Sequence, residues 1–293
     1  MSAPPSLPVA LFHHAGSRRE EPWLFRAEGW DWRWHSWGEI AERVQGQVAG
    51  LTDRPRGARV PFFYEARPEA VVFDLAIQSA GLVAAPGGGP PPEPSLPQPP
   101  LSRPLPPAPT GREGALNDSF RFSPSSPGEV RREGAGEEGR GGEGFGGAVV
   151  VRNGQPVELS AAELIAMADG VQALIGPSVE REIVVLSRSI EIPAERAMLA
   201  WATVAGAAVV LEPNPAFRVA TAAWVRPTVF HGTAAELQAL RTWVEKEKRG
   251  FLRRRPRLPF RRLRTILVTG SALREDDEAF WRGRGVRVCR IAA

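Results

Sequence analysis

From position 60 to position 85 the sequence reads Val60-Pro-Phe-Phe-Tyr-Glu-Ala-Arg-Pro-Glu-Ala-Val-Val-Phe-Asp-Leu-Ala-Ile-Gln-Ser-Ala-Gly-Leu-Val-Ala-Ala85. The run from Val60 to Tyr64 favours a short strand, and Pro68 is suited to the first turn of a helix. The buried face of that helix is expected to consist of Val71, Val72, Leu75 and Ile77. Ala80-Gly81 ends the helix, and a second strand follows. A buried helix between two strands predicts a parallel sheet with a right-handed crossover, and therefore an α/β fold.

Tryptophans mark a hairpin before this stretch. The segments 23–29 and 30–35 predict two strands joined at Glu28-Gly29, with Trp30, Trp32 and Trp34 on one face. The five tryptophans from Trp23 to Trp37 could stack on nucleic-acid bases, although packing of a hairpin face is their more ordinary use. Ser36 and Glu39 then form a capping-box pattern for a helix that runs to about position 51.

A second alternation of strands and helices begins near position 148. Asn153-Gly154 predicts a tight turn between strands 148–151 and 157–159, and Ser160 with Glu163 predicts a capped helix. Further strands are expected at 183–186, 207–211, 228–230, 265–268 and 286–291, with helices at 194–205, 233–246 and 276–282. This order predicts a doubly wound, mainly parallel sheet.

Between the two blocks lies a proline- and glycine-rich segment, 87–146, that is too poor in apolar residues to offset the entropy of ordering. We expect it to be a disordered insert. The predicted organisation is a first α/β block at 1–86, the insert at 87–146, and a second block of the same domain at 147–293.

Composition limits the classes of protein that remain. The 293 residues are 43% hydrophobic, and their formal net charge is +4. The single cysteine, Cys289, excludes an internal disulfide framework and is expected to be a buried strand residue. Residues 1–8 do not resemble a secretory signal, and the longest apolar stretch, 197–211, is too short to span a bilayer. We therefore expect a cytoplasmic protein.

The histidines, which show no metal-ligand spacing, are His13, His14, His35 and His231.

Several segments resemble one family in its own order. Residues 37–44 and 68–86 are similar to the N-terminal region of AMP-forming acyl-CoA synthetases, in particular the long-chain type. In the second block the similar segments are 159–164, Glu195-Arg196, 206–211, 225–232 and 267–273. The resemblance implies part of the N-terminal domain of an adenylate-forming enzyme. It also implies a reaction that uses ATP with Mg²⁺ and CoA.

The departures from that family concern its chemistry. Where the family has a Ser/Thr/Gly-rich phosphate loop followed by Pro-Lys-Gly, residues 144–156 contain neither a hydroxyl cluster nor a lysine. Gly146 and Gly147 could form an anion-binding nest, or they could be the end of a flexible linker. Ile192 stands at the position of a family histidine beside the acyl site. The nucleotide-binding glutamate segment, the ribose-binding aspartate and the C-terminal lid domain with its catalytic lysine would lie beyond Ala293, so we expect them to be absent.

One remnant of the binding site is expected to survive. Gly270, Ser271 and Ala272 match the family segment near the adenine and acyl pocket, although an ordinary strand-to-helix turn explains them equally simply. They do not form a nucleophile elbow, because the Gly-x-Ser-x-Gly spacing is not met. We assign no catalytic residue and no metal ligand. ATP, Mg²⁺ and CoA are expected as cofactors only if another chain completes the site.

A basic segment, Lys246 to Arg264, interleaves cations with phenylalanine and leucine. This mixture suits anionic lipid headgroups or nucleic-acid phosphates, and it is also compatible with a solvated linker. Because long-chain synthetases are similar in having a basic, membrane-associating stretch near this place, contact with an anionic membrane surface is preferred over nucleic acid.

Three functional hypotheses remain open at this stage. The first is a degenerate synthetase-like protein that binds acyl groups or acts as a partner of a complete acyl-CoA synthetase. The second is one part of a split AMP-forming ligase that another chain completes. The third is the product of a decayed gene.

Overall fold

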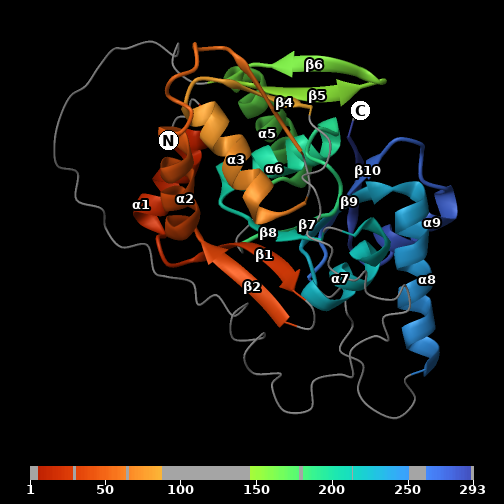
Figure 1. Ribbon diagram of the computed structural model, residues 1–293. Helices are drawn as coiled ribbons and strands as arrows, with labels where there is room; N and C mark the ends of the chain where they lie inside the picture. The colour runs from red at the N-terminus through yellow and green to blue at the C-terminus, as the bar shows by residue number, and fades with distance from the viewer. Residues whose placement is uncertain are drawn as a thin grey trace, which may run out of the picture. The chain divides into compact units, whose positions relative to one another are not determined.

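Two mainly parallel sheets organise the chain (Figure 1). The computed structural model describes residues 6–28, 31–63, 66–87, 146–177, 181–212, 214–250 and 262–291, which fall in one structural unit. Except for its end residues, Gly87 and Gly146, the segment predicted to be a disordered insert lies outside the described residues.

The larger sheet has the strand order β11-β10-β9-β7-β8-β1-β2. Its strands are β1 (Pro22–Glu28), β2 (Asp31–Ser36), β7 (Ile183–Leu186), β8 (Ala208–Leu211), β9 (Val229–Thr233), β10 (Thr265–Thr269) and β11 (Arg287–Arg290). All neighbours are parallel except β1 and β2, which form the predicted antiparallel hairpin. Every residue of β7 and β8 is buried, as expected for apolar strands that are covered on both faces.

The smaller sheet has the order β3-β4-β5-β6. Its strands are β3 (Arg59–Phe62), β4 (Val83–Pro86), β5 (Ala148–Arg152) and β6 (Gln155–Leu159). The two sequence blocks are interleaved, because β4 pairs with β5 in this sheet and β1 pairs with β8 in the larger one. Each block therefore contributes strands to both sheets.

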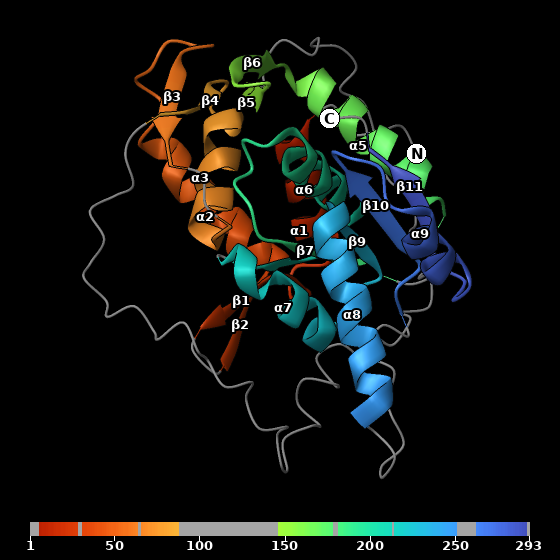
Figure 2. The same cartoon turned by 90° about the vertical axis from the view of Figure 1, so that its right-hand side faces the viewer.

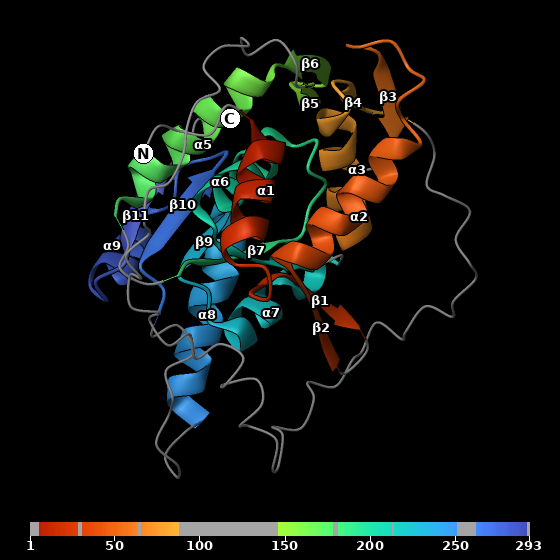
Figure 3. The ribbon, with the colours of Figure 1, turned by 90° about the vertical axis from the view of Figure 1, so that its left-hand side faces the viewer.

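One apolar core joins the two sheets. The helices that contribute to it are α1 (Leu7–Ser17), α2 (Trp37–Ala49), α3 (Pro68–Ser79), α5 (Ala161–Ile175) and α6 (Pro193–Ala205). Helices α3 and α6 contact strands of both sheets and lie between them (Figures 1 and 3). The remaining helices are α7 (Arg218–Val225), which follows the short 3-10 helix η1 (Pro215–Phe217), α8 (Ala234–Gly250) and α9 (Glu275–Arg282); Figure 2 shows α7 and α8 beside β7 and β9.

A buried ion pair fixes α6 against α3. The Nη1 atom of Arg196 lies 2.6 Å from Oδ2 of Asp74, and both side chains are fully buried. Gln78 donates a second hydrogen bond to the same carboxylate at 2.8 Å, and Nε of Arg196 donates to the carbonyl of Ile190 at 3.1 Å. Additional hydrogen bonds help a protein to tolerate a buried charge pair. Here they reach Oδ2 of Asp74, while its Oδ1 is buried without a hydrogen-bond partner.

The predicted packing of the tryptophan hairpin holds in part. Trp23 stacks on Trp37 with a centroid distance of 4.1 Å, and both are fully buried. Trp34 on β2 is instead 47% exposed, and Trp30 lies outside the described residues.

Within the described residues, every helix is too short or too polar to traverse a lipid bilayer.

Candidate functional site

The carboxyl ends of four parallel strands form the candidate site. In open α/β sheets ligands bind beyond these ends, where loops and helix starts meet. Here β7 is followed by Ser187 and Arg188, β8 by Glu212, and β10 by Gly270, while β9 ends at Thr233. Helix α6 begins close to this edge and supplies Glu195 from its first turn.

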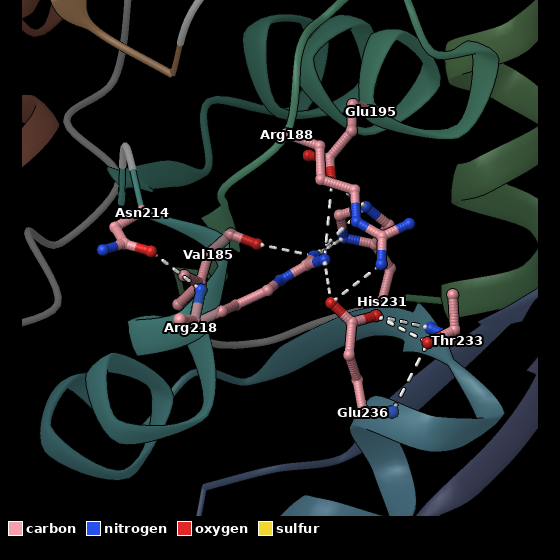
Figure 4. Close-up of polar contacts among 9 residues, drawn as sticks. Val185, Arg188, Glu195, Asn214, Arg218, His231, Thr233 and Glu236 are labelled. Atoms are coloured by element: carbon pink, nitrogen blue, oxygen red, sulfur yellow. Dashed lines mark hydrogen bonds and ion pairs between the residues drawn. The ribbon is translucent and has the colours of Figure 1, made fainter. Parts of the chain in front are cut away.

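A buried triad of charged and polar side chains occupies the edge (Figure 4). His231 of β9 lies with Nε2 3.1 Å from Oε1 of Glu195, and both side chains are at most 2% exposed. The Nη2 atom of Arg218 lies 2.7 Å from Nδ1 of His231 and 3.2 Å from the carbonyl oxygen of Val185. The three side chains come from α6, β9 and the start of α7, so the fold alone brings them together.

Glu236 extends this cluster toward solvent. Its carboxylate lies 3.3 Å from Nη1 of Arg218 and 3.1 Å from Nη2 of Arg188, whose side chain is 33% exposed. The same carboxylate accepts from the backbone N–H of Thr233 at 2.7 Å, while Thr233 Oγ1 accepts from the Glu236 N–H at 3.4 Å. This reciprocal pair is a capping box at the start of α8.

Mutual interactions set the charge states of the cluster. Burial would raise the pKa of Glu195, but His231 and Arg218 outweigh it, and the pKa is lowered. The pKa of Glu236 is lowered against burial in the same way, chiefly by Arg218. Burial lowers the pKa of His231, and Glu195 opposes this shift without cancelling it. At neutral pH the cluster therefore contains two guanidinium groups, two carboxylates and a neutral imidazole.

The arrangement is better suited to holding elements together than to proton transfer. Nη2 of Arg218 lies 2.7 Å from Nδ1 and 3.2 Å from Nε2 of His231. Because an arginine has no acceptor, we assign the lone pair to the nearer nitrogen, Nδ1, and the ring proton to Nε2, which lies toward Glu195. Both ring nitrogens of His231 are thus engaged within the protein. Within the described residues, no group of three or more His, Cys, Asp or Glu side chains could hold a metal ion.

Sequence reasoning did not find this cluster. Its members stand on four elements and have no common spacing, because only the sheet topology makes them neighbours. The sequence does contain the Thr233–Glu236 capping pattern and the Glu195-Arg196 pair, yet neither pattern indicates His231 as a partner.

The predicted remnant, Gly270-Ser271-Ala272, lies directly after β10 and is exposed. Thr269 pairs with Thr233, so this turn is at the same edge as the cluster. Gly270 has a φ of +76°, a left-handed conformation that glycine adopts without strain. A strand-to-helix turn accounts for this glycine, and the role of the segment in an adenine or acyl pocket stays a prediction.

The segment that the resemblance places at the phosphate loop is a closed hairpin. Strands β5 and β6 pair without interruption up to Arg152 and Gln155, and Asn153 and Gly154 make the two-residue turn with φ values of +51° and +77°. Two residues with positive φ are typical of a type I′ turn, so the predicted hairpin is confirmed.

Gly146 and Gly147 are needed for close backbone packing. A Cβ at Gly146 would lie 1.7 Å from the carbonyl oxygen of Leu82, and one at Gly147 would lie 2.1 Å from that of Leu159. The N–H of Gly146 donates to the carbonyl of Gln78 at 3.0 Å. Both glycines are buried, so their interpretation as a flexible linker end is wrong.

The remaining predicted residues lie at the periphery of the site or outside the described residues. Ile192 is the half-buried N-cap of α6 and offers no side-chain capping bond. Cys289 lies on β11 as expected, but it is half-buried at the sheet edge. The basic segment from Lys246 begins in the last turn of α8, and its part from 251 to 261 lies outside the described residues.

No protein-family model and no curated protein sequence matches the chain. Solved structures do match its fold. The inhibitor-bound N-terminal domain of FACL13 from Mycobacterium tuberculosis aligns with a TM-score of 0.67 at 12% identity, over 98% of this chain and 75% of that one. A Mycobacterium tuberculosis fatty acyl CoA synthetase gives 0.65 at 13% identity, over 97% of this chain and 58% of that one. The nonribosomal peptide synthetase FmoA3, in its AMPPNP-bound form, gives 0.66 at 16%, over 98% of this chain and 31% of that one.

The chain therefore has the fold of the N-terminal domain of adenylate-forming enzymes, with mainly parallel sheets, as the sequence predicts. At these identities the likeness establishes the fold and does not establish an activity.

Proposed function

We propose that this protein is a non-adenylating derivative of the AMP-forming acyl-CoA synthetase fold, of the long-chain type, that acts as an acyl-binding or partner module. The observation that carries the proposal is the two-residue turn between β5 and β6. On the resemblance described above, this turn stands where synthetases hold the ATP phosphates.

Phosphate loops work by wrapping several free backbone N–H groups and a lysine around the ligand. Asn153-Gly154 is too short to wrap around a triphosphate, and the residues that flank the turn are already paired with each other. The turn contains no serine, threonine or lysine. Both the short, paired backbone of the turn and its lack of a hydroxyl or lysine side chain therefore argue for a loss of phosphate binding.

The carboxyl edge supports the same reading. Arg218, His231 and Glu195 are buried there and directed at one another, where a catalytic site would need groups directed at a substrate. Ile192 adds an apolar side chain at the position of a family histidine.

A second candidate is one part of a split ligase, because the fold that the chain matches is that of the N-terminal domain of such enzymes. The chain spans 58% of the fatty acyl CoA synthetase that it matches. In this reading another chain supplies the phosphate loop, the glutamate segment and the lid, and ATP, Mg²⁺ and CoA bind only to the assembled pair.

Pyrophosphate release by the purified full-length chain with a long-chain fatty acid, ATP, Mg²⁺ and CoA tests the proposal. We expect no release above the no-enzyme background, and we expect no heat of ATP binding by titration calorimetry. A matched variant replaces Asn153-Gly154 by a Ser/Thr/Gly-rich loop with Pro-Lys-Gly, and a gain of ATP binding is expected in that variant. Formation of acyl-AMP by the unmodified chain would refute the proposal.

The acyl-binding part needs its own measurement. Titration with a long-chain acyl-CoA and with the free fatty acid, without ATP, is expected to show saturable binding of at least one of them. If neither ligand binds, the acyl-binding role is excluded and the partner role remains. Co-purification from the native host with a complete synthetase or with a complementing chain tests the partner role separately.

A further inference from the structure

Helix α7 has little apolar surface with which to hold itself on the larger sheet. Its buried face consists mainly of Ala222, Ala223 and Val225, and its largest side chain, Trp224, is 38% exposed. Small side chains remove little apolar area from water, so they contribute little to docking. The polar contacts of Arg218 and Thr221 must supply much of the remainder.

Those contacts are concentrated at the start of the helix. Arg218, the first residue of α7, reaches the carbonyl of Val185 on β7, His231 on β9, and the carboxylates of Glu195 and Glu236 on α6 and α8. Thr221 adds one hydrogen bond from Oγ1 to Oε2 of Glu212 at 2.7 Å. A single guanidinium thus connects α7 to four other elements.

The contact between Arg218 and His231 requires the neutral imidazole. Nδ1 of His231 accepts from Nη2 of Arg218 at 2.7 Å, and a second ring proton would occupy that same nitrogen. Protonation would turn the contact into two donors that face each other. It would also add a positive charge to a buried site whose two arginines and two glutamates now balance.

The groups around His231 do not relieve this conflict. The ring is faced by Glu195 from α6, Arg218 from α7 and Glu236 from α8. Glu236 is itself paired with Arg188, which lies in the segment after β7. Glu212 at the end of β8 is already bound to Thr221. Because the pKa values of Glu195 and Glu236 are lowered, both carboxylates stay ionised over the pH range in which a histidine titrates.

We propose that His231 and Arg218 form an acid-sensitive latch, in which protonation of His231 expels Arg218 and releases α7 from the carboxyl edge of β7 and β9. Burial lowers the pKa of His231, so the closed form excludes the second proton, whereas the open form binds it at the ordinary value of 6.5. Opening is therefore rare above that value and increases as the pH falls below it. This inference concerns α7 alone and does not depend on the proposed loss of adenylation.

Hydrogen–deuterium exchange of the full chain, read by mass spectrometry on peptides from 214–226, tests the latch. With an open-state pKa near 6.5, lowering the pH from about 7.5 to about 5.5 is expected to raise the corrected opening equilibrium of α7 about tenfold. Peptides from α5 and β7 are expected to keep their protection. In His231→Asn, whose amide oxygen can accept from Arg218 but cannot titrate, the response of α7 is expected to disappear.

Two controls keep the test decisive. His14→Asn removes the other buried histidine with a lowered pKa, far from α7 in the sequence, and should leave the response of α7 intact. If His231→Asn folds poorly, an NMR titration of the His231 ring in the unmodified chain replaces it. The ring is expected to stay neutral while α7 is closed and to gain its proton only as α7 opens, at a pH below the ordinary range of a histidine. Equal corrected rates at the two pH values, or a tenfold response that persists in folded His231→Asn, would overturn the latch.

Discussion

At the scale of single residues, two neighbours on α6 serve different parts of the molecule. Glu195 turns to the carboxyl edge of the larger sheet, where it meets His231 and Arg218. Arg196 turns to Asp74 on α3, in the layer between the sheets. The sequence pair is thus divided between the candidate site and the support of that site.

The ion pair between Arg196 and Asp74 gives a prediction of stability. Asp74→Ala leaves the guanidinium buried without its carboxylate, and we expect the free energy of unfolding to fall by about 3–5 kcal/mol. Urea unfolding followed by circular dichroism measures the change. The double variant Asp74→Leu with Arg196→Met should recover most of it, because apolar residues of similar volume replace a buried pair at small cost. A single variant as stable as the native chain would contradict the role given to this pair.

Close packing of backbones gives a second prediction. A methyl group at Gly147 would meet the carbonyl of Leu159, so we expect Gly147→Ala to destabilise the protein by about 1–3 kcal/mol. The matched control is Gly170→Ala in α5, where no atom lies within 4 Å of the added carbon. That control is expected to stabilise the helix by up to about 1 kcal/mol, since alanine is the better helix former. Thermal unfolding of both variants measures whether each substitution lowers or raises the stability of the protein.

At the scale of elements, α5 shows how a local signal sets a boundary. Ser160 accepts from the N–H of Glu163 at 3.3 Å, and Glu163 accepts from the N–H of Ser160 at 2.8 Å. The capping box predicted at this position is therefore complete. At α2 the analogous pattern is only half used, because the Glu39 carboxylate pairs with His35 and not with the N–H of Ser36.

The difference between the two helix starts can be measured. Ser160→Ala removes one of the two cap contacts of α5 and is expected to cost about 1 kcal/mol of stability. Ser36→Ala removes the side-chain cap of α2 and is expected to have a similar cost. Glu163→Ala should have a larger effect than Glu39→Ala, because only Glu163 accepts from the N–H of its N-cap residue. Equal effects of the two alanine variants would contradict the difference in geometry.

Local patterns predict most elements but not all of them. The strands, α2, α3, α5, α6, α8 and α9 follow from periodicity, capping residues and turn residues. Helix α1 is absent from the prediction although Ser6 caps it, because its weak pattern gives no clear apolar face. Helix α7 is absent because its small residues specify little by themselves and its position depends on Arg218 meeting groups distant in sequence.

At the scale of the whole molecule, the sequence predicts the fold class, but it does not predict which strands pair in each sheet. Strand β1 of the first block lies beside β8 of the second block. Local propensity contains no information on such pairing, because it concerns residues almost two hundred positions apart. The same limit hides the polar cluster, whose members meet only after the larger sheet has formed.

The basic segment gives a prediction for the chain as a whole. Binding of Lys246–Arg264 to vesicles that contain phosphatidylserine is expected to be weak and to fall with salt, because exposed charges are screened over about 10 Å at 0.1 M salt. Vesicle co-sedimentation over a series of salt concentrations measures this. Pure phosphatidylcholine vesicles are the control, and equal binding to both kinds of vesicle would exclude electrostatic attachment to a membrane surface.

The exchange of strands between the two sheets has a consequence for biosynthesis. When the ribosome has completed the first block, β1 still lacks β8 and β4 still lacks β5, so both strands present open edges. The smaller sheet lacks its last strand until Leu159 has emerged, and β1 lacks its partner β8 until Leu211 has emerged. Until those partners are made, the edges of β1 and β4 are sites at which nascent chains can pair with one another and aggregate.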